Sequence, residues 1–310
     1  MNISTRQVDA FLALAAQRSF TRAAAQCHLS QPAFSALIRA LEDDLGLRLF
    51  DRSTRHVSLT AEGENFHASA LRIRAEVDAA LATLRDAALL RRGRVSVALL
   101  PSLAAGWLPG VLAGFRAQHP GVELDIADVL SEPCIERVAT GKADFALAAI
   151  RADTPELQAE PFCEDGFHLV CRADHPLARQ PLPAGRRSAA AQWRALAEWP
   201  FIHLARHSSV RQYLEAAFHP HAMRTLMEVE QLATVMGMVR AGLGISVVPT
   251  LTLFHFQQEG LATRPLALPG LTRQIYLVRR RDRGLSVAAQ ALYARVMQQR
   301  PMHAEMPSKQ

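Results

Sequence analysis

Lysine is nearly absent from this chain, since only Lys142 and Lys309 occur among 310 residues and arginine supplies the rest of the 35 basic side chains. Arginine carries a planar fork of donors that suits phosphates and guanine edges, although a high genomic GC content gives the same bias. The formal net charge is +6, but residues 1–92 hold 12 basic and 10 acidic side chains, so the excess is not concentrated there. The overall charge therefore permits an acidic partner such as nucleic acid without requiring one.

Metal-binding cysteine spacing and membrane-length apolar runs are also missing. The four cysteines form no Cys-x-x-Cys pair, which argues against a zinc site and favours free thiols in a reducing cytoplasm. The apolar stretch AFLALAA at 10–16 is too short to span a bilayer, and Asp9 and Arg18 bracket it. It also lacks the layout of a signal peptide. We therefore expect a cytoplasmic protein with no membrane partner.

The common catalytic motifs are absent as well. The sequence has no Gly-x-Ser-x-Gly elbow, no His-Glu-x-x-His pair and no P-loop. The stretch GLGIS at 242–246 is rich in glycine, but it precedes a predicted strand and is typical of the turn that ends a helix. His203 and His207 are four residues apart, yet they fall on a predicted strand and the loop after it, so they share no helical face. We expect neither a cofactor nor a bound metal, and no enzyme activity.

Three regions of the chain differ in their hydrophobic pattern. Residues 1–58 contain short helical periods, 59–91 form one long alanine-rich helical pattern, and 92–300 alternate β-type and helical runs before a polar tail at 301–310. The predicted fold class is an α+β multidomain protein. It combines a small helical head, a long linker helix and a C-terminal α/β body.

The head contains two short helical patterns joined by a tight turn. The segment TRQVDAFLALAAQRS predicts a first helix, and Thr21 is a candidate N-cap for the alanine-rich helix that follows. Ser30 is a natural N-cap for the next helix, which carries Pro32 in its first turn, where the missing N–H costs little. This arrangement predicts a helix-turn-helix.

The helix after Ser30 has two distinct faces. An apolar face recurs at three- and four-residue steps, and its members are Phe34, Leu37, Ile38, Leu41 and Leu45. Gln31, Ser35 and Arg39 follow one another at four-residue steps on the other side, while residues 42–44 supply charged groups typical of a solvated end. An amide, a hydroxyl and a guanidinium are groups that read base edges in a major groove, although an ordinary polar face has the same pattern.

The stretch RLFDRSTRHVSLT next to this helix predicts a short hairpin, or wing. Arg52, Arg55 and His56 cluster at its turn. Basic side chains beside a reading helix would clamp phosphates and fix register without specifying sequence.

These residues resemble a known family. The 45-residue stretch SFTRAAAQCHLSQPAFSALIRALEDDLGLRLFDRSTRHVSLTAEG is similar to the winged helix-turn-helix of LysR-type transcriptional regulators. The resemblance implies binding to double-stranded promoter DNA at an inverted repeat. Many members carry polar residues where this chain has Ala36 and Leu37, which narrows its reading surface. The expected DNA-binding residues are Thr21, Arg22, Ser30, Gln31, Pro32, Ser35, Arg39, Arg52, Arg55 and His56.

The region 59–91 reads as one helix of about 45 Å at 1.5 Å per residue. Thr60 is its candidate N-cap, and apolar residues recur at alternating steps of four and three residues, which is a heptad seam. The seam needs a partner: a second copy of the chain, or the chain's own body. The resemblance implies that this helix pairs two subunits in a homodimer or homotetramer. The expected dimerisation residues are Phe66, Ile73, Val77 and Leu84.

The body alternates strands and helices, which predicts a parallel sheet with right-handed crossovers. Two sets of alternations predict two lobes with a cleft between them: lobe 1 at about 92–163 and 266–300, and lobe 2 at about 164–265. The stretches RADHPLA and VRAGLGISVVP support a resemblance to the periplasmic-binding-protein-like effector domain of the same regulators, which extends to about residue 300.

Several predicted strands run into helices through serine. Ligands of open α/β sheets bind beyond the carboxyl ends of strands, where helix N-termini offer free N–H groups to anions. Hydroxyls there suit a small polar or anionic effector, although each serine alone is more often a plain helix cap. The expected effector-binding residues are Ser102, Leu103, Ser131, Ser208 and Ser209, with Arg151 and Arg206 near the same strand ends.

The sequence thus predicts a sequence-specific transcriptional regulator whose body binds a small effector, with RNA polymerase as a further candidate partner. Two alternatives stay open. One is a DNA-tethered enzyme that converts the ligand of the cleft. The other is an architectural DNA-binding protein that senses nothing.

Overall fold

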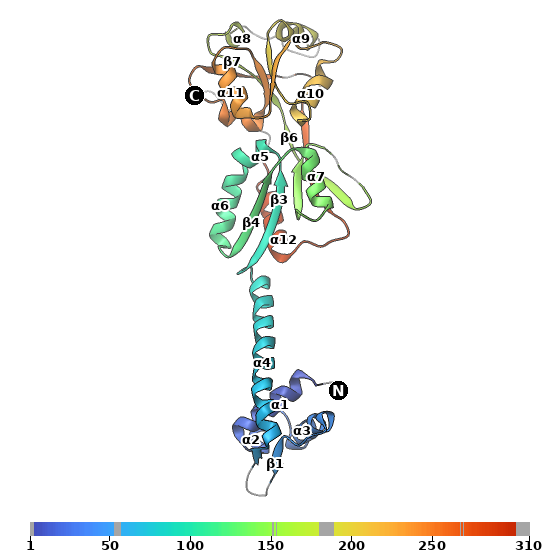
Figure 1. Ribbon diagram of the computed structural model, residues 1–310. Coiled ribbons are helices and arrows are strands. Elements are labelled where there is room, and N and C mark those ends of the chain that lie inside the picture. The colour runs from blue at the N-terminus through green and yellow to red at the C-terminus, as the bar shows by residue number, and fades with distance from the viewer. Residues whose placement is uncertain are drawn as a thin grey trace. The chain divides into compact units, whose positions relative to one another are not determined.

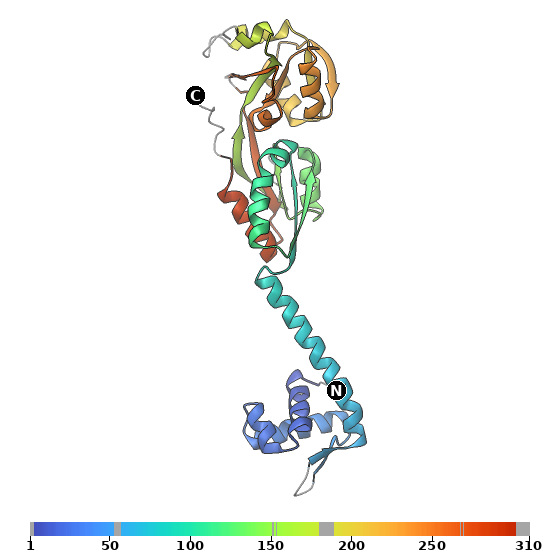
Figure 2. The same cartoon turned by 90° about the vertical axis from the view of Figure 1, so that its left-hand side faces the viewer.

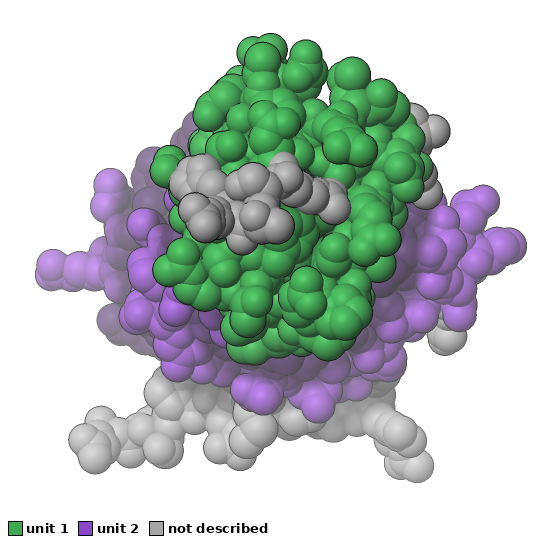
Figure 3. All heavy atoms as spheres, turned by 90° about the horizontal axis from the view of Figure 1, so that it is seen from below, with its two compact units in different colours: residues 1–88 green, residues 89–310 purple. Residues whose placement is uncertain are grey.

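The computed structural model describes residues 3–52, 57–150, 152, 154–179, 189–266, 268 and 270–301. The chain divides into two compact units, Met1–Ala88 (unit 1) and Leu89–Gln310 (unit 2), shown in different colours in Figure 3. Within the described part of the chain, no helix is both long enough and apolar enough to cross a membrane.

Unit 1 is built from helices and a short antiparallel ribbon in which Phe50 pairs with Leu59 (Figure 1). Its elements are α1 (Thr5–Gln17), α2 (Phe20–Gln26), α3 (Gln31–Leu45), β1 (Phe50–Arg52), β2 (Val57–Leu59) and α4 (Ala61–Ala88).

Hydroxyl caps define where these helices begin. Ser30 accepts a hydrogen bond from Ala33 N at the start of α3, and Thr60 Oγ1 accepts one from Gly63 N (2.9 Å) at the start of α4, both as predicted. The prediction that Thr21 caps the second helix is wrong. Ser19 has the extended backbone of an N-cap and accepts from Arg22 N, so Thr21 already lies in the first turn of α2.

The core of unit 1 joins helices α1, α2, α3 and α4 to the ribbon. The ring of Phe11 on α1 lies 5.2 Å from that of Phe50 and 4.9 Å from that of Phe66, between centroids. Ala70 on α4 is fully buried in the same core. The first turns of α4 are therefore part of the helical head, because their apolar side chains complete its core.

Glu42 on α3 departs from the expectation of a solvated charged end. Its side chain is buried, and Oε1 accepts hydrogen bonds from Leu49 N (2.9 Å) and Phe50 N (3.2 Å). Gly46 ends the helix with a left-handed backbone (φ 68°), which lets the chain turn back toward Glu42. The carboxylate therefore fixes the entry into β1 instead of facing water.

Unit 2 contains two lobes. The elements are β3 (Gly93–Leu99), α5 (Pro101–Gly106), α6 (Leu108–Gln118), β4 (Val122–Asp128), α7 (Ser131–Ala139), β5 (Phe145–Ala148), β6 (Leu157–Asp165), β7 (Phe167–Arg172), α8 (Pro176–Arg179), α9 (Ala189–Ala197), β8 (Phe201–Leu204), α10 (Ser209–Phe218), β9 (Thr225–Val229), α11 (Leu232–Arg240), β10 (Ser246–Pro249), the 3₁₀ helix η2 (Thr250–His255), β11 (Leu261–Leu266), β12 (Arg273–Arg280) and α12 (Val287–Gln298).

Lobe 1 is a five-stranded sheet in the order β4-β3-β5-β12-β6. Strand β3 is parallel to β4 and β5, whereas β12 is antiparallel to β5 and β6. The expectation of a parallel sheet is therefore wrong for β12, because this strand returns from lobe 2 and enters the sheet from the opposite end. Helices α6 and α12 cover one face of the sheet and α7 the other (Figure 1 and Figure 2).

Lobe 2 combines the antiparallel sheet β10-β7-β11 with the parallel pair β8-β9. The chain enters it from β6 into β7 through Gly166 and leaves it between β11 and β12. Each lobe has its own apolar core, which is why a cavity can lie between the lobes.

Candidate functional site

Helix α3 is the predicted reading helix, and only part of the polar row predicted on it is exposed. Gln31, Pro32 and Arg39 are exposed. Ser35 is only 9% exposed, so the prediction of one exposed row is wrong at this residue. Its hydroxyl accepts a hydrogen bond from Arg39 Nη2 (3.4 Å), one turn later on the same helix. Ala36, not Ser35, occupies the exposed surface beside Gln31 and Arg39.

The other predicted DNA-binding residues lie at helix ends or in the wing. Thr21, Arg22 and Ser30 are exposed, and Arg22 Nη2 donates to Gln17 O (2.8 Å), which tethers its guanidinium to α1. Arg55 and His56 lie outside the described residues. So does the side chain of Arg52, whose backbone forms the end of β1.

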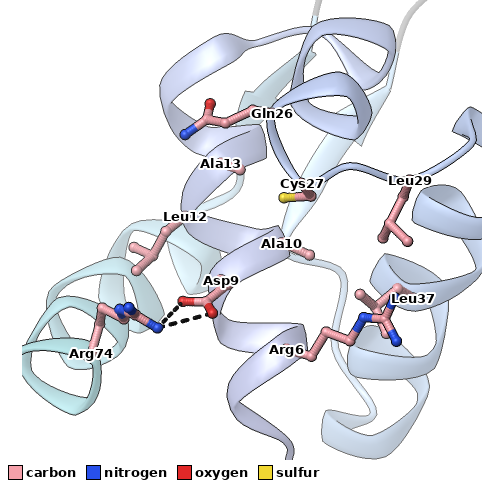
Figure 4. Close-up of a pocket in the computed structure, with 10 residues that line it drawn as sticks. All are labelled: Arg6, Asp9, Ala10, Leu12, Ala13, Gln26, Cys27, Leu29, Leu37 and Arg74. Atoms are coloured by element: carbon pink, nitrogen blue, oxygen red, sulfur yellow. Dashed lines mark hydrogen bonds and ion pairs between the residues drawn. The ribbon is translucent and has the colours of Figure 1, made fainter. Parts of the chain in front are cut away.

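An ion pair within unit 1, which the sequence did not reveal, joins α4 to α1. Arg74 Nη1 donates to both carboxylate oxygens of Asp9 at 3.0 Å, and a second pair on α4 links Arg74 to Asp78 (2.8 Å). Figure 4 shows the Asp9 pair at the edge of a cavity of about 430 Å³, with Arg6 on the other side and Cys27 above it. Because Asp9 and Arg74 are 65 residues apart, no local pattern could predict their contact.

The predicted dimerisation residues divide into two sets. Phe66 packs against Phe11 in the core of unit 1, so its ring already contacts its own chain. Val77 is half-buried, Ile73 is exposed, and Leu84 is 67% exposed. The later turns of α4 thus keep an apolar stripe uncovered within unit 1.

The cleft between the lobes of unit 2 holds a cavity of about 420 Å³. Lobe 1 contributes α5 and the end of β4, and lobe 2 contributes the first turns of α10 and α11; Figure 1 shows α5 at the end of lobe 1 nearest lobe 2. Leu100, Leu130, Leu204 and Val210 form an apolar part of the wall. A mostly apolar wall with a few convergent polar groups is typical of a small-molecule site.

A buried arginine on the returning strand β12 organises the polar groups of this cleft. Arg273 is only 2% exposed and pairs with Asp165, whose Oδ2 lies 2.9 Å from Nε and 2.7 Å from Nη2. Its Nη2 also donates to Ser102 Oγ (2.6 Å), and its Nη1 donates to Ser209 Oγ (3.2 Å). Asp165 Oδ1 accepts from Leu251 N (3.0 Å). One guanidinium therefore holds a serine of lobe 1 and a serine of lobe 2.

The hydrogen bonds around Arg273 determine which serine hydroxyls act as acceptors. Ser102 and Ser209 accept from a cation, and Ser208 accepts from Arg211 N as the N-cap of α10. A hydroxyl that already accepts keeps its proton for donation, so these groups favour a hydrogen-bond acceptor in the cavity. Among the described residues, no base accepts a hydrogen bond from these three hydroxyls.

Of the remaining predicted effector residues, Ser131, Leu103 and Arg206 do not line this cavity. Ser131 is buried, and its hydroxyl accepts from Ala149 N (3.1 Å). Leu103 belongs to the core of lobe 1. Arg206 has a side chain that is 77% exposed and pairs with Glu228 (3.2 Å), while Arg151 lies outside the described residues.

Two carboxylates and an imidazole also border the cavity. The side chain of Asp128 has no hydrogen-bonding or ionic partner among the described residues, and desolvation raises the pKa of its carboxyl. Glu230 lies 3.4 Å from His207 Nε2 and is largely exposed. Burial lowers the pKa of His255, which keeps its ring neutral at neutral pH.

The thiols of unit 2 are protonated at neutral pH and therefore unreactive. Burial raises the pKa of Cys134 and Cys163 to about 12 and that of Cys171 to about 11. The thiolate is the nucleophile and the metal ligand, so these residues stay protonated and inert at neutral pH. The described residues also contain no group of three His, Cys, Asp or Glu side chains placed to hold a metal ion.

Comparisons with known proteins agree with this two-part organisation. Residues 5–64 match the model of the bacterial regulatory helix-turn-helix protein, lysR family, and residues 89–301 match that of the LysR substrate binding domain. The second match alone spans more than half of the chain.

Three relatives illustrate the similarity. A RuBisCO operon transcriptional regulator from Allochromatium vinosum is 34% identical over 300 residues, which cover 94% of each chain. The HTH-type transcriptional regulator YbhD from Escherichia coli (strain K12) is 31% identical over 93% of this chain and 89% of its own. A solved full-length variant of OxyR from Pseudomonas aeruginosa superposes with a TM-score of 0.77 over 95% of this chain and 100% of its own, at 22% identity. The chain belongs to the LysR family of DNA-binding transcriptional regulators.

Proposed function

We propose that this regulator recognises a specific operator through residues 1–58, pairs with a second copy through 59–91 and binds a small effector in the cleft of 92–300. Effector binding changes the affinity for the operator by shifting the population of cleft conformations. The observation that carries the effector role is the Arg273 network, which presents two serine hydroxyls from different lobes to one cavity.

The cleft binds its ligand without converting it. Ser102 and Ser209 are hydrogen-bonded to a guanidinium that a carboxylate already neutralises, which supports a donor role and not an activated nucleophile. The chemistry of the cleft thus supports a sensor more than a DNA-tethered enzyme. We place the protein in the cytoplasm, where free thiols persist and its DNA target is accessible.

Genome-wide mapping of the bound protein tests this function. We expect occupancy at a small number of promoters that share an inverted repeat, with footprints altered by metabolites connected to the adjoining genes. RNA polymerase at the same promoters would identify it as a further partner. Uniform occupancy without a shared sequence would instead support an architectural DNA-binding protein and contradict the proposal.

Gln31→Ala tests base reading by α3. Gln31 is exposed in the first turn, and a bidentate contact from such an amide to adenine contributes about 1–3 kcal/mol of discrimination. We expect affinity for the mapped operator to fall while affinity for random DNA stays nearly constant, as measured by fluorescence anisotropy at several salt concentrations. Equal losses on both DNAs would assign Gln31 to positioning and not to base reading.

Leu84→Glu tests pairing through α4. Leu84 lies on the uncovered apolar stripe, so a carboxylate there would be buried without a partner in a paired state. We expect dissociation into monomers at concentrations where the wild type is dimeric, measured by sedimentation velocity. Ala82→Glu is the control, because Ala82 is also exposed but lies on the opposite side of the helix. Unchanged association of Leu84→Glu would exclude this stripe as the interface.

A further inference from the structure

We propose that the effector is a zwitterion of the α-amino-acid class, whose carboxylate binds the helix N-termini of lobe 2 and whose ammonium pairs with Asp128 of lobe 1. This inference rests on the proposed effector role of the cleft and names the chemical class of its ligand. It narrows the expectation of a small polar or anionic effector, because the cavity has an acidic side as well as a donor side.

The donor side is built from two helices of lobe 2. Ser208 and Ser209 begin α10 at the cavity, and Gln231 and Leu232 begin α11 there. The N-cap Gln231 makes no side-chain capping bond, so the first N–H groups of α11 remain without a partner inside the helix. Both helix dipoles direct partial positive charge at the same space.

Buried hydroxyls supply an independent indication of a ligand there. Ser102 is 4% exposed, and Ser208 and Ser209 are 5% exposed, yet all three line the cavity. Each accepts one hydrogen bond, and none donates to any described residue. Three buried hydroxyl protons without an acceptor are costly unless the cavity supplies one. A carboxylate offers two oxygens with about four lone-pair sites, which suits this set.

The acidic side is Asp128 at the end of β4. The other titratable groups that border the cavity are paired, exposed beside a histidine, or neutral: Arg273 pairs with Asp165, Glu230 is largely exposed and lies 3.4 Å from His207 Nε2, and burial lowers the pKa of His255. Asp128 is the one without a partner among the described lining residues. Asp128 is exposed and lines the cavity, and a carboxylate without a partner gains from an ammonium group within a few ångströms.

Neither half of a zwitterion alone satisfies both sides. A dicarboxylate would bring negative charge toward Asp128, and a simple amine would leave the hydroxyls of Ser102 and Ser209 without an acceptor. The apolar wall formed by Leu100, Leu130 and Val210 leaves room for an aliphatic side chain. Because Asp128 lies in lobe 1 and the α10 and α11 N-termini lie in lobe 2, only a ligand with both charges links the two lobes electrostatically.

The test uses the full-length protein and its three tryptophans, all of which lie in unit 2. Thermal unfolding is followed by tryptophan fluorescence with each of the twenty standard amino acids in turn. For any amino acid that raises the melting temperature, affinity is then measured by calorimetry. The same measurement follows for its analogue without the amino group and its analogue without the carboxylate.

We expect at least one amino acid to bind, and both analogues to bind roughly tenfold more weakly or worse. Asp128→Asn should lower the affinity for the amino acid by a similar factor and leave that for the deaminated analogue nearly unchanged. Asp125→Asn is the matched control, since Asp125 lies on the same strand but pairs with Arg94 (2.8 Å) and does not line the cavity. Unliganded melting temperatures verify that both variants are folded.

Three other outcomes overturn the inference, and they differ in what they say about the effector role. If no amino acid binds but an organic acid, amine or neutral metabolite from a screening panel does, the zwitterion is wrong and the effector role stands. The same holds if the deaminated analogue binds as tightly as the amino acid and Asp128→Asn changes neither affinity. If no compound of any class raises the melting temperature or alters operator binding, both the zwitterion and the effector role fail.

Discussion

Replacing Arg273 by Met lowers the free energy of unfolding of unit 2 by about 3–5 kcal/mol, the loss expected when one partner of a buried ion pair is removed. The carboxylate of Asp165 is fully buried and would keep only the hydrogen bond from Leu251 N. Ser102 and Ser209 lose their shared donor in the same step. The variant should therefore lose ligand responsiveness together with stability.

Tryptophan fluorescence during denaturant unfolding measures this change selectively. Trp107, Trp193 and Trp199 are the only tryptophans and all belong to unit 2, so the midpoint reports on that unit alone. A lower midpoint with an unchanged slope would indicate lost stability and not a changed unfolded state.

The matched control is Arg206→Met, which removes an exposed member of an ion pair in the same unit. Arg206 is 77% exposed and Glu228 is 34% exposed, and such surface pairs contribute about 0–1 kcal/mol. If Arg273→Met were as stable as Arg206→Met, the Arg273 network would not be the structural centre of the cleft.

Local sequence signals predicted the starts of α3 and α4 but not the long-range contacts of unit 1. A serine before Pro32 was enough to place the cap at Ser30, because an N-cap depends on neighbouring residues alone. The same logic failed for the second helix, where Ser19 and Thr21 are both suitable caps two residues apart. Which hydroxyl caps the helix depends on the backbone conformation at each position, and the local sequence does not specify that conformation.

Residue periodicity also misassigned groups that the fold buries. Glu42 looked like part of a charged, solvated helix end, yet the turn after Gly46 brings two backbone N–H groups onto its carboxylate. Phe66 fitted the heptad seam of α4, yet the ring of Phe11 packs against it. In both cases the periodic pattern allowed two placements of the side chain, and a tertiary contact within unit 1 determined which one it takes.

The location of the cleft was predictable from the sequence, but its buried ion pair was not. Serines at strand ends indicated Ser102, Ser208 and Ser209, all of which line the cavity. Arg273 and Asp165 were missed because 108 residues separate them. One signal was available: Arg273 shares the inward register of β12 with Ile275 and Leu277, and an arginine at such a position needs a buried partner.

Replacing Glu42 by Ala should abolish operator binding while leaving unit 2 intact. The substitution leaves the N–H groups of Leu49 and Phe50 buried without their acceptor, which costs about 2–4 kcal/mol in total. These N–H groups lie where the chain passes from α3 into β1. Without their acceptor, the wing should lose its fixed position relative to the reading helix. Specific and nonspecific DNA binding should both fall, because phosphate contacts and base contacts depend on the same segment.

Two neighbouring substitutions and two optical signals separate this effect from a general loss of charge. Glu42→Gln keeps an acceptor oxygen and should retain most of the stability, whereas Asp43→Ala removes an exposed acid from the adjacent position and should change stability by only about 0.5 kcal/mol. Circular dichroism follows the helices of both units and tryptophan fluorescence follows unit 2 alone, so an early transition seen only by circular dichroism locates the damage in unit 1. Full operator affinity in Glu42→Ala would show that the wing is held by its own strand pairing, through Phe50 and Leu59, and not by this carboxylate.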